Sequence, residues 1–305
     1  MIRYVSRRIV QALVTLVVVS LVLFLVMKLY GGDPGWIMLG RFATPAKVRA
    51  LDQALGVLRS WPVQYVDWLR QLFLGGLSSA FAALPPTILY FALGGGIGLV
   101  LAVLVALAQA AHPGTWIDHL TSVGSLVFYA LPSFWLGLVL FLIFAAQLEW
   151  LPLAPPGLAP GGQGPLGWSL AMVLPVLTLA LTSVSAWSMH LRAAMEDALA
   201  SDYVRTARAK GLPERLVLRR HVLREALLPL LTMIGMSFPV LLSQVIVLQL
   251  VFHLAGIGGL LESAIYYRLF GLLLNTVLVI GVITIATNLV VDILAAVADP
   301  RVRFG

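Results

Sequence analysis

Long uncharged runs alternate with short charged stretches along this chain, and the pattern predicts helices that cross a membrane. A spanning helix needs about 20 apolar residues, and six runs reach that length. The predicted spans cover approximately residues 9–29, 87–110, 120–147, 168–190, 227–252 and 270–297. We therefore expect an all-α integral membrane protein with six transmembrane helices, in which residues 1–305 form a single transmembrane domain.

The first apolar run follows three arginines, a pattern that signal peptides share with first membrane spans. Arg3, Arg7 and Arg8 precede the run from Ile9 to Met27. The run has about the length of a span, and no small-x-small cleavage site follows it. We expect a retained span whose N-terminus lies inside.

Residues 31–86 separate the first two spans and are predicted to form an extracytoplasmic segment. Thr44-Pro45 within it is typical of a capped helix start. The stretch from Gln64 to Leu74 is typical of a second, amphipathic helix with Tyr65 and Trp68 at interface depth. In the second span, glycines at 94–96 and 98 favour close approach of a neighbouring helix.

One stretch interrupts the apolar pattern. Residues 191–229 hold eight of the twenty Lys and Arg and five of the thirteen Asp and Glu. Charges at this density must be solvated, so we expect a loop outside the bilayer over residues 191–226. Ser201 or Asp202 can cap a helix there. Gly211 can end that helix in the left-handed conformation and Pro213 can open the next, which predicts a helix, a tight elbow and a helix.

Composition and charge agree with this interpretation. The chain is 60% hydrophobic and 11% charged, whereas soluble domains carry about 25% charged residues. It contains no cysteine, which excludes disulfides and thiolate chemistry. With six spans, the side that holds the charged stretch and both termini carries 13 Lys and Arg against 6 on the other side. The positive-inside rule makes that side cytoplasmic, and the net charge of +7 then indicates anionic lipid headgroups and not nucleic acid.

Several strings in the chain match a family pattern in order and spacing. They are Gly32-Asp33-Pro34, LPSFWLG from Leu131 to Gly137, DYVRTARAKGL from Asp202 to Leu212, Arg220-His221, Leu228-Pro229 and Asp299-Pro300-Arg301. Together they resemble the permeases of ABC importers in the dipeptide, oligopeptide and nickel branch, in particular the first of the two permeases.

This resemblance implies the type I importer permease fold in a bacterial inner membrane, multi-pass, with both termini cytoplasmic. It implies a second homologous permease in a heterodimer, two cytoplasmic ABC ATPase subunits and an extracytoplasmic substrate-binding protein. ATP and Mg would bind to the ATPase subunits, so the chain would hold no cofactor and would be a transport subunit, not an enzyme. Peptides are the expected cargo; nickel chelates, glutathione, haem and oligosaccharides are the alternatives.

The resemblance also assigns the elbow to coupling with the ATPase. In that role the elbow sits in a cleft of the ATPase subunit while nearby basic side chains contact its surface. The coupling residues would be Asp202, Tyr203, Arg205, Thr206, Ala207, Arg208, Lys210, Gly211, Leu212, Pro213, Glu214, Arg215 and Arg219. A solvated loop between helices is the alternative interpretation.

Two further groups are weaker candidates. Polar or aromatic residues within the spans are candidates for the lining of the passage, although small polar side chains also serve helix packing: Ser133, Trp135, Ser237 and Gln244. Gly256, Gly258 and Gly259 stand where relatives have an outer loop, which indicates either a binding-protein contact or a packed loop.

Asp292 is a carboxyl within the last span, with Asn288 one turn away. An ionised carboxylate at mid-bilayer costs about 2.5–3.5 kcal/mol, so it requires a partner or water. We expect a structural polar contact there, with a gate or substrate role as the alternative.

Motifs for catalysis and metal binding are missing. The chain has no Gly-x4-Gly-Lys-Ser/Thr phosphate loop and no His-Glu-x2-His, so we expect neither ATP binding nor a metal site. Its five histidines are spread over both sides. A membrane enzyme that acts on lipid is the alternative from another class, and a receptor or scaffold is a third.

Overall fold

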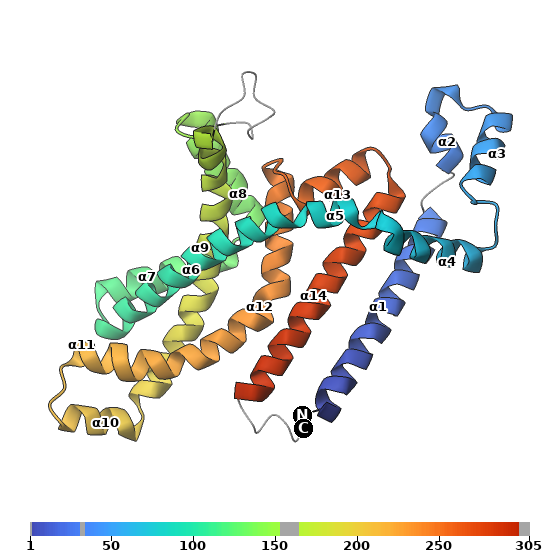
Figure 1. Ribbon diagram of the computed structural model, residues 1–305. Helices are drawn as coiled ribbons and strands as arrows, with labels where there is room; N and C mark the ends of the chain where they lie inside the picture. The colour runs from blue at the N-terminus through green and yellow to red at the C-terminus, as the bar shows by residue number, and fades with distance from the viewer. Residues whose placement is uncertain (1, 31–33, 153–164, 299–305) are drawn as a thin grey trace. The chain divides into compact units, whose positions relative to one another are not determined.

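The computed structural model describes residues 2–30, 34–152 and 165–298. Within these ranges the chain forms helices joined by short connections, without a strand (Figure 1). The helices divide into two compact units, one of residues 1–85 and 259–305 and the other of residues 86–258. The strings Gly32-Asp33 and Asp299-Pro300-Arg301 lie outside the described residues.

The first unit combines two long helices with several short ones. It contains α1 (Ile2–Tyr30), α2 (Pro34–Leu39), η1 (Gly40–Phe42), α3 (Pro45–Ala54), α4 (Trp61–Gln71), η2 (Leu72–Gly76), α5 (Ser78–Ala82), most of α13 (Ile257–Tyr266) and α14 (Phe270–Ala298). The predicted helix start at Thr44-Pro45 is confirmed, because Thr44 Oγ1 accepts a hydrogen bond from the Lys47 amide at 3.4 Å.

The second unit holds the longest of the described helices, α9. It contains nearly all of α6 (Leu84–Ala111), α7 (Trp116–Ala130), α8 (Ser133–Phe141), η3 (Leu142–Gln147), α9 (Pro165–Leu199), α10 (Asp202–Ala209), α11 (Glu214–Leu216), η4 (Val217–Val222) and α12 (Leu223–Val251). Pro175, Pro229 and Pro239 lie inside these helices.

Among the described residues, five helical stretches are long and apolar enough to cross a membrane. They are Ser6–Leu29, Ser78–Ala111, Ser169–Leu199, Glu214–Val251 and Phe270–Val291. The pair Trp116–Ala130 and Ser133–Gln147 passes the same test together and makes a sixth when counted as one span. The described helices therefore agree with the predicted all-α membrane protein of six spans.

The third predicted span, residues 120–147, is not one straight helix. Its two halves are bent by 103° at the Leu131-Pro132 break. A proline has no amide hydrogen to donate, and its ring pushes the preceding residue out of the helical region. Leu131 accordingly has φ −82° and ψ 132°. The string LPSFWLG therefore begins at a break between two helices, which its apolar composition does not indicate.

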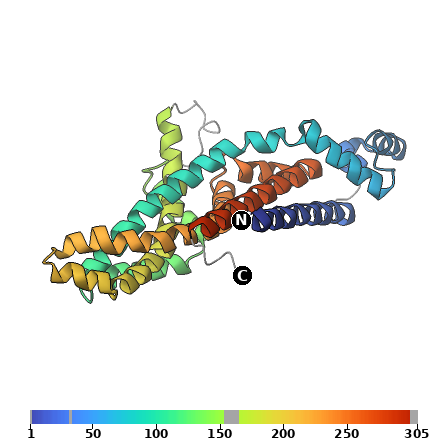
Figure 2. The same cartoon turned by 60° about the horizontal axis from the view of Figure 1, so that its bottom comes forward.

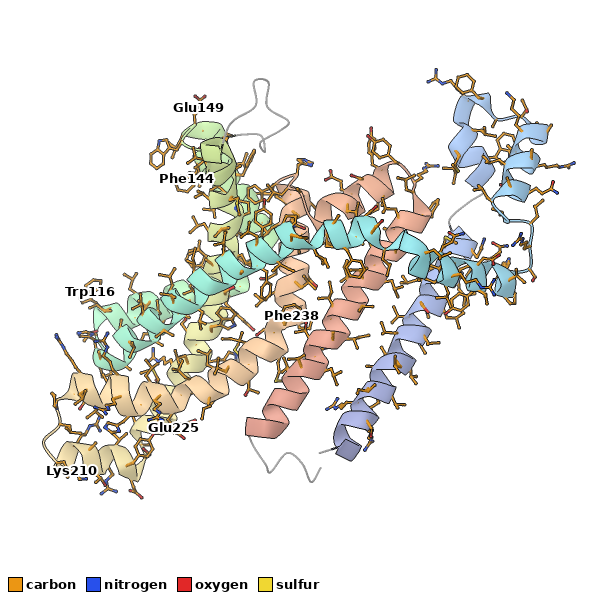
Figure 3. All side chains as sticks on the ribbon, viewed as in Figure 1. Trp116, Phe144, Glu149, Lys210, Glu225 and Phe238 are labelled. Atoms are coloured by element: carbon orange, nitrogen blue, oxygen red, sulfur yellow. The ribbon has the colours of Figure 1, made fainter. Side chains whose placement is uncertain are left out.

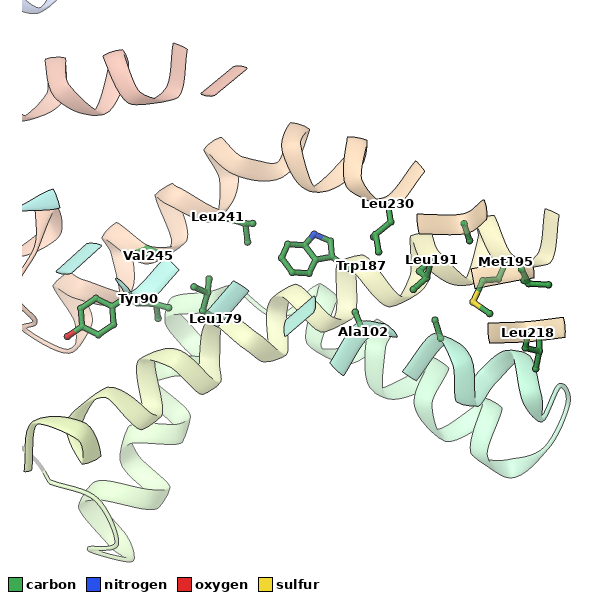
Figure 4. Packing of buried hydrophobic residues seen from close by; sticks show 14 of the residues in the cluster. Tyr90, Ala102, Leu179, Trp187, Leu191, Met195, Leu218, Leu230, Leu241 and Val245 are labelled. Atoms are coloured by element: carbon green, nitrogen blue, oxygen red, sulfur yellow. The ribbon is translucent and has the colours of Figure 1, made fainter. Parts of the chain in front are cut away.

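Glycines let α6 and α9 approach closely in the second unit. A Cβ at Gly94 would lie 2.5 Å from Leu179 Cδ2, and one at Gly98 would lie 2.7 Å from Ser183 Cβ. The predicted close approach is confirmed at these two positions, whereas nothing lies within 4 Å of a Cβ at Gly96. Figure 4 shows Leu179 within the buried cluster that this contact creates.

In the first unit, aromatic packing joins α1 to α4, and hydrogen bonds of Asn275 join α14 to α4 and η2. The Phe24 ring lies 5.3 Å from that of Tyr65 and 6.3 Å from that of Trp68. The Trp68 indole donates to Asn275 Oδ1 at 3.0 Å, and Asn275 Nδ2 donates to the Gly76 carbonyl at 2.7 Å. Tyr65 and Trp68 therefore pack between helices, in addition to any role at interface depth.

Gly98→Val should destabilise the isolated chain because its side chain would collide with Ser183 and the Ala180 backbone. Overpacking of this kind costs about 1–3 kcal/mol. Gly96→Val is the matched control, since it adds the same side chain to the same helix where space is open. Thermal unfolding in detergent should show a lower Tm for Gly98→Val alone; equal Tm values would contradict the close α6–α9 contact.

Candidate functional site

The charged segment of residues 191–226 folds as a helix, an elbow and a second helix. α10 ends at Ala209, and Gly211 then takes a left-handed φ of +77° while its amide donates to the Arg208 carbonyl at 2.9 Å. Pro213 is extended, and its carbonyl accepts from the Leu216 amide at 2.8 Å as the next helix begins. The predicted elbow from Gly211 to Pro213 is confirmed; Figure 3 shows the neighbouring Lys210 at this turn.

An ion pair closes the two sides of the elbow. Arg208 Nη2 lies 2.6 Å from Glu214 Oε1, and Arg208 Nε donates to Oε2 at 3.1 Å. These hydrogen bonds lower the pKa of the Glu214 carboxyl and raise the pKa of Arg208. A lowered carboxyl pKa means that the contribution is present at neutral pH and is lost only as the pH falls through that value. Both side chains are about half exposed, so the pair shapes the turn more than it stabilises the fold.

The elbow has an apolar underside that belongs to the core of its unit. Val204 on α10 and Val217 and Val222 on η4 are fully buried, and Leu218 is 4% exposed. They continue the cluster formed by the spans, which Figure 4 shows running from Leu241 to Leu218. The elbow is therefore an extension of the packed helices and not a free loop.

The predicted coupling residues divide by exposure. Most are exposed, with Leu212 half-buried and Ala207 buried; the exposed ones are Asp202, Tyr203, Arg205, Thr206, Arg208, Lys210, Gly211, Pro213, Glu214, Arg215 and Arg219. The structure thus brings the predicted set together as one polar surface above an apolar base. Figures 1 and 2 agree that α10 lies beside the helix that starts with α11.

The second helix of the segment is not α-helical throughout. Residues Val217–Val222 form the π turn η4, closed by a bond from the Leu223 amide to the Leu218 carbonyl. A π turn inserts one extra residue and often marks a functional position. The 3.6-residue spacing of leucines in this stretch predicted an α-helix, and it contains no signal for the insertion.

A polar cluster that was not predicted from the sequence lies near the C-terminal end of α9. Arg192 Nη1 lies 2.5 Å from Asp118 Oδ1, and Arg192 Nε lies 2.8 Å from Glu196. Asp118 is 4% exposed and also accepts from the Gly114 amide at 2.9 Å. Ser122 Oγ receives hydrogen bonds from Arg192 and from Gln109 on α6.

The cluster ties together the ends of three helices, α6, α7 and α9, next to the start of the charged segment. Its two ionic partners are 74 residues apart, so their contact has no local signature. One signal was available, because Asp118 is the only Asp, Glu, Lys or Arg between Arg70 and Glu149. A lone carboxyl in so apolar a stretch requires a partner.

Two of the four predicted pathway residues line one cavity. Ser237 and Gln244 on α12 face a cavity of about 130 Å³, together with Thr182 and Trp187 on α9. Ser133 is half-buried and Trp135 is 46% exposed, and neither lines this cavity. The two candidates on α12 thus share a cavity with α9, and the two on α8 do not line it.

Gly256 and Gly258 of the predicted outer loop are buried and not exposed to solvent. Gly256 has φ +141°, and a Cβ there would lie 2.2 Å from Gln249 Nε2. Gln249 Oε1 accepts from the Gly258 amide at 2.8 Å, and Thr87 Oγ1 accepts from the Ile257 amide at 2.9 Å. Gly256 and Gly258 therefore shape the segment, while Gly259 is half-buried.

The remaining candidates have no shared site among the described residues. Asn288 is exposed on α14, and the side chain of Asp292 lies outside the described residues. Within the described part of the chain, no group of three or more His, Asp or Glu side chains has the arrangement to hold a metal ion.

Two family models match this chain, one over its N-terminal part and one over the remainder. Residues 98–304 match the model of the binding-protein-dependent transport system inner membrane component. Residues 1–89 match the N-terminal model of the membrane component of the same systems. The N-terminal model thus matches the first part of the chain, and the inner membrane component model matches the rest.

Individual relatives align over nearly the whole length. The chain is 34% identical to a peptide transport system permease protein of Brucella abortus, with 98% of each chain covered. It is 28% identical to an oligopeptide transport system permease protein of Bacillus subtilis, with 99% of each covered. The crystal structure of an amino acid ABC transporter aligns with a TM-score of 0.53 at 18% identity, over 77% of this chain and 98% of that one, which supports the fold.

Arg192→Met should lower the Tm of the isolated chain by several degrees, because the buried Asp118 loses its ionic partner. Arg205→Met is the matched control: it breaks a pair with Asp202 whose side chains are 78% and 97% exposed. Differential scanning fluorimetry in detergent compares the two variants. An Arg192→Met protein as stable as Arg205→Met would show that the cluster does not hold the helices.

Proposed function

Because the chain belongs to the family of binding-protein-dependent transport system inner membrane components, the permeases of ABC transporters, we propose that it forms half of the translocation pathway of a peptide importer. As a family member it is a multi-pass inner membrane protein and a transport subunit that works in a complex with other subunits. The cargo follows from the relatives: those reported above are named as peptide or oligopeptide permeases and align end to end.

The observation that carries the proposal is the two-sided construction of the elbow. Its upper surface is charged and exposed, and its underside is fully buried at Val204, Val217 and Val222. A partner that moves the upper surface must move the core beneath it, since packed interiors transmit strain. This is the construction that a coupling element requires.

The partners in this proposal are a second homologous permease, two cytoplasmic ATPase subunits and an extracytoplasmic binding protein. The elbow, with Gly211, Leu212, Pro213 and Glu214 at its tip, docks in a cleft of one ATPase, and Arg205, Arg208, Arg215 and Arg219 contact the ATPase surface. ATP and Mg bind to the ATPases. Both termini of the permease lie in the cytoplasm with the elbow.

Movement of the elbow would reach the pathway through α9 and α12. Both helices leave the charged segment, and both contribute walls to the cavity lined by Thr182, Ser237 and Gln244. Thr182 Oγ1 lies 3.4 Å from Gln244 Oε1 across that cavity. Closure of the two ATPases would draw the elbows together and rock α9 against α12, which alternates access from the two sides.

A binding protein would meet the segment that follows α12. His253 and Ala255 are exposed there, while the buried Gly256 and Gly258 hold the backbone in place through Gln249. The glycines therefore serve docking by shaping the surface, and their exposed neighbours make the contact.

Gly211→Trp should abolish the ATPase activity that the loaded binding protein stimulates, and with it peptide uptake into proteoliposomes. The substitution forces a bulky side chain into a left-handed backbone at the docking tip. Gly114→Trp is the matched control, because Gly114 has φ +73° and equally open surroundings. It should keep at least half of the stimulated activity.

The outcomes separate the two parts of the proposal. Full stimulation in Gly211→Trp, with both ATPases still co-purifying, would contradict the coupling role. Normal stimulation of the unmodified complex without uptake of any labelled peptide would contradict the cargo and leave coupling intact.

A further inference from the structure

An open recess lies beside the elbow, on the side where the charged segment meets the span. Tyr203 of α10 forms one wall, and a stripe from η4 and α12 forms the other: Arg220, His221, Arg224, Glu225 and Leu228. Its volume is about 640 Å³. The tip of the elbow, residues 211–214, does not line it, although Tyr203 belongs to the predicted coupling residues.

The two arginines of the recess have no partner among the described residues. Arg208, Arg192 and Arg205 all form ion pairs with nearby carboxylates. Arg220 and Arg224 form no ion pair or hydrogen bond with any described residue, although Glu225 is adjacent in sequence to Arg224. Both are exposed and one helical turn apart, so two guanidinium groups are available to one anion.

With Val251 taken as one edge of the bilayer, the length of the helix puts this recess at the depth of lipid headgroups on the other side. The helical stretch Glu214–Val251 has 38 residues, whereas a bilayer with both headgroup layers takes about 27–30 residues of helix. Counted back from Val251, those residues end at about 222–225, next to Arg224. The first large exposed apolar side chains beyond this point are Leu228 and Leu231, each 59% exposed.

From this geometry we propose that the recess binds the phosphate of an anionic phospholipid. The guanidinium groups of Arg220 and Arg224 donate hydrogen bonds to the non-ester phosphate oxygens, a pairing that planar guanidinium groups favour. The Tyr203 hydroxyl donates from the opposite wall, and Leu228 contacts the start of the acyl chain. Basic recesses on the cytoplasmic side of transmembrane helices bind lipid headgroups in this way.

The composition of the recess selects a singly charged phosphodiester over a polyphosphate. Glu225 lines the same wall and would repel the additional negative charges of a nucleotide or of a strongly acidic protein surface. The apolar rim at Leu228 fits an acyl chain and no part of a soluble anion. A lipid bound here would hold α10 against α12 at the base of the elbow.

The test compares lipid selectivity of the assembled transporter in nanodiscs that contain phosphatidylglycerol and phosphatidylcholine. Spin-labelled phosphatidylglycerol measures the fraction of lipid immobilised on the protein. The double variant Arg220→Gln/Arg224→Gln should lower the preference for the anionic lipid by about fivefold per arginine. Arg41→Gln/Arg49→Gln removes the same charge from exposed positions of the segment 31–86 that form no ion pair with a described residue, and it should leave the preference unchanged.

Three results would overturn the proposal. One is an unchanged preference in the Arg220→Gln/Arg224→Gln complex. Another is displacement of the labelled lipid by millimolar inorganic phosphate, which would assign the recess to a soluble anion. The third is loss of the ATPase subunits from the variant during purification while lipid preference persists, which would assign the arginines to a protein contact.

Discussion

Burial beneath the elbow is the constraint on which the rest of the second unit depends. Val204, Val217 and Val222 are sealed under a segment that is otherwise among the most polar in the chain. Burying side chains of this size stabilises by about 1.5–3 kcal/mol each, so the elbow gains more from its base than from its exposed ion pairs. A charged segment with such a base can receive force at one surface and deliver it to the spans.

Polar contacts then determine where that force can go. The Asp118–Arg192 pair joins the start of α7 to the C-terminal part of α9, and the Gln249–Thr87 contact joins α12 to the start of α6. In an apolar setting a polar group without a partner costs free energy, so these few contacts specify which helices stay together. Ser237 and Gln244 line a cavity to which both α9 and α12 contribute.

The features readable from sequence are those that local chemistry or helix length decides. The elbow followed from Gly211 and Pro213, because a left-handed helix end and a helix-opening proline are properties of those residues alone. The spans followed from uncharged length. The break at Leu131-Pro132 was missed because continuous apolar composition outweighed the conformational rule for the residue before proline.

Contacts between residues far apart in the sequence could not be predicted from local chemistry or helix length. Nothing near Arg192 indicates that its partner is Asp118, and periodicity contains no sign of the extra residue in η4. Among the pathway candidates, hydroxyl and amide side chains looked alike, and only packing showed that Ser237 and Gln244 share a cavity that Ser133 does not reach. The sequence left Gly256 and Gly258 open between a binding-protein contact and a packed loop, and both are buried against Gln249.

The most direct measurement of the central idea uses the absence of cysteine from the chain. Lys210→Cys places a single thiol at the exposed tip of the elbow, and Phe42→Cys places one in the predicted extracytoplasmic segment. Each is labelled with a photoreactive maleimide in the assembled transporter and irradiated. An elbow that docks on the ATPase will cross-link to that subunit from residue 210 and not from residue 42. Cross-linking from residue 42, or a tip at residue 210 that reaches only lipid, would contradict it.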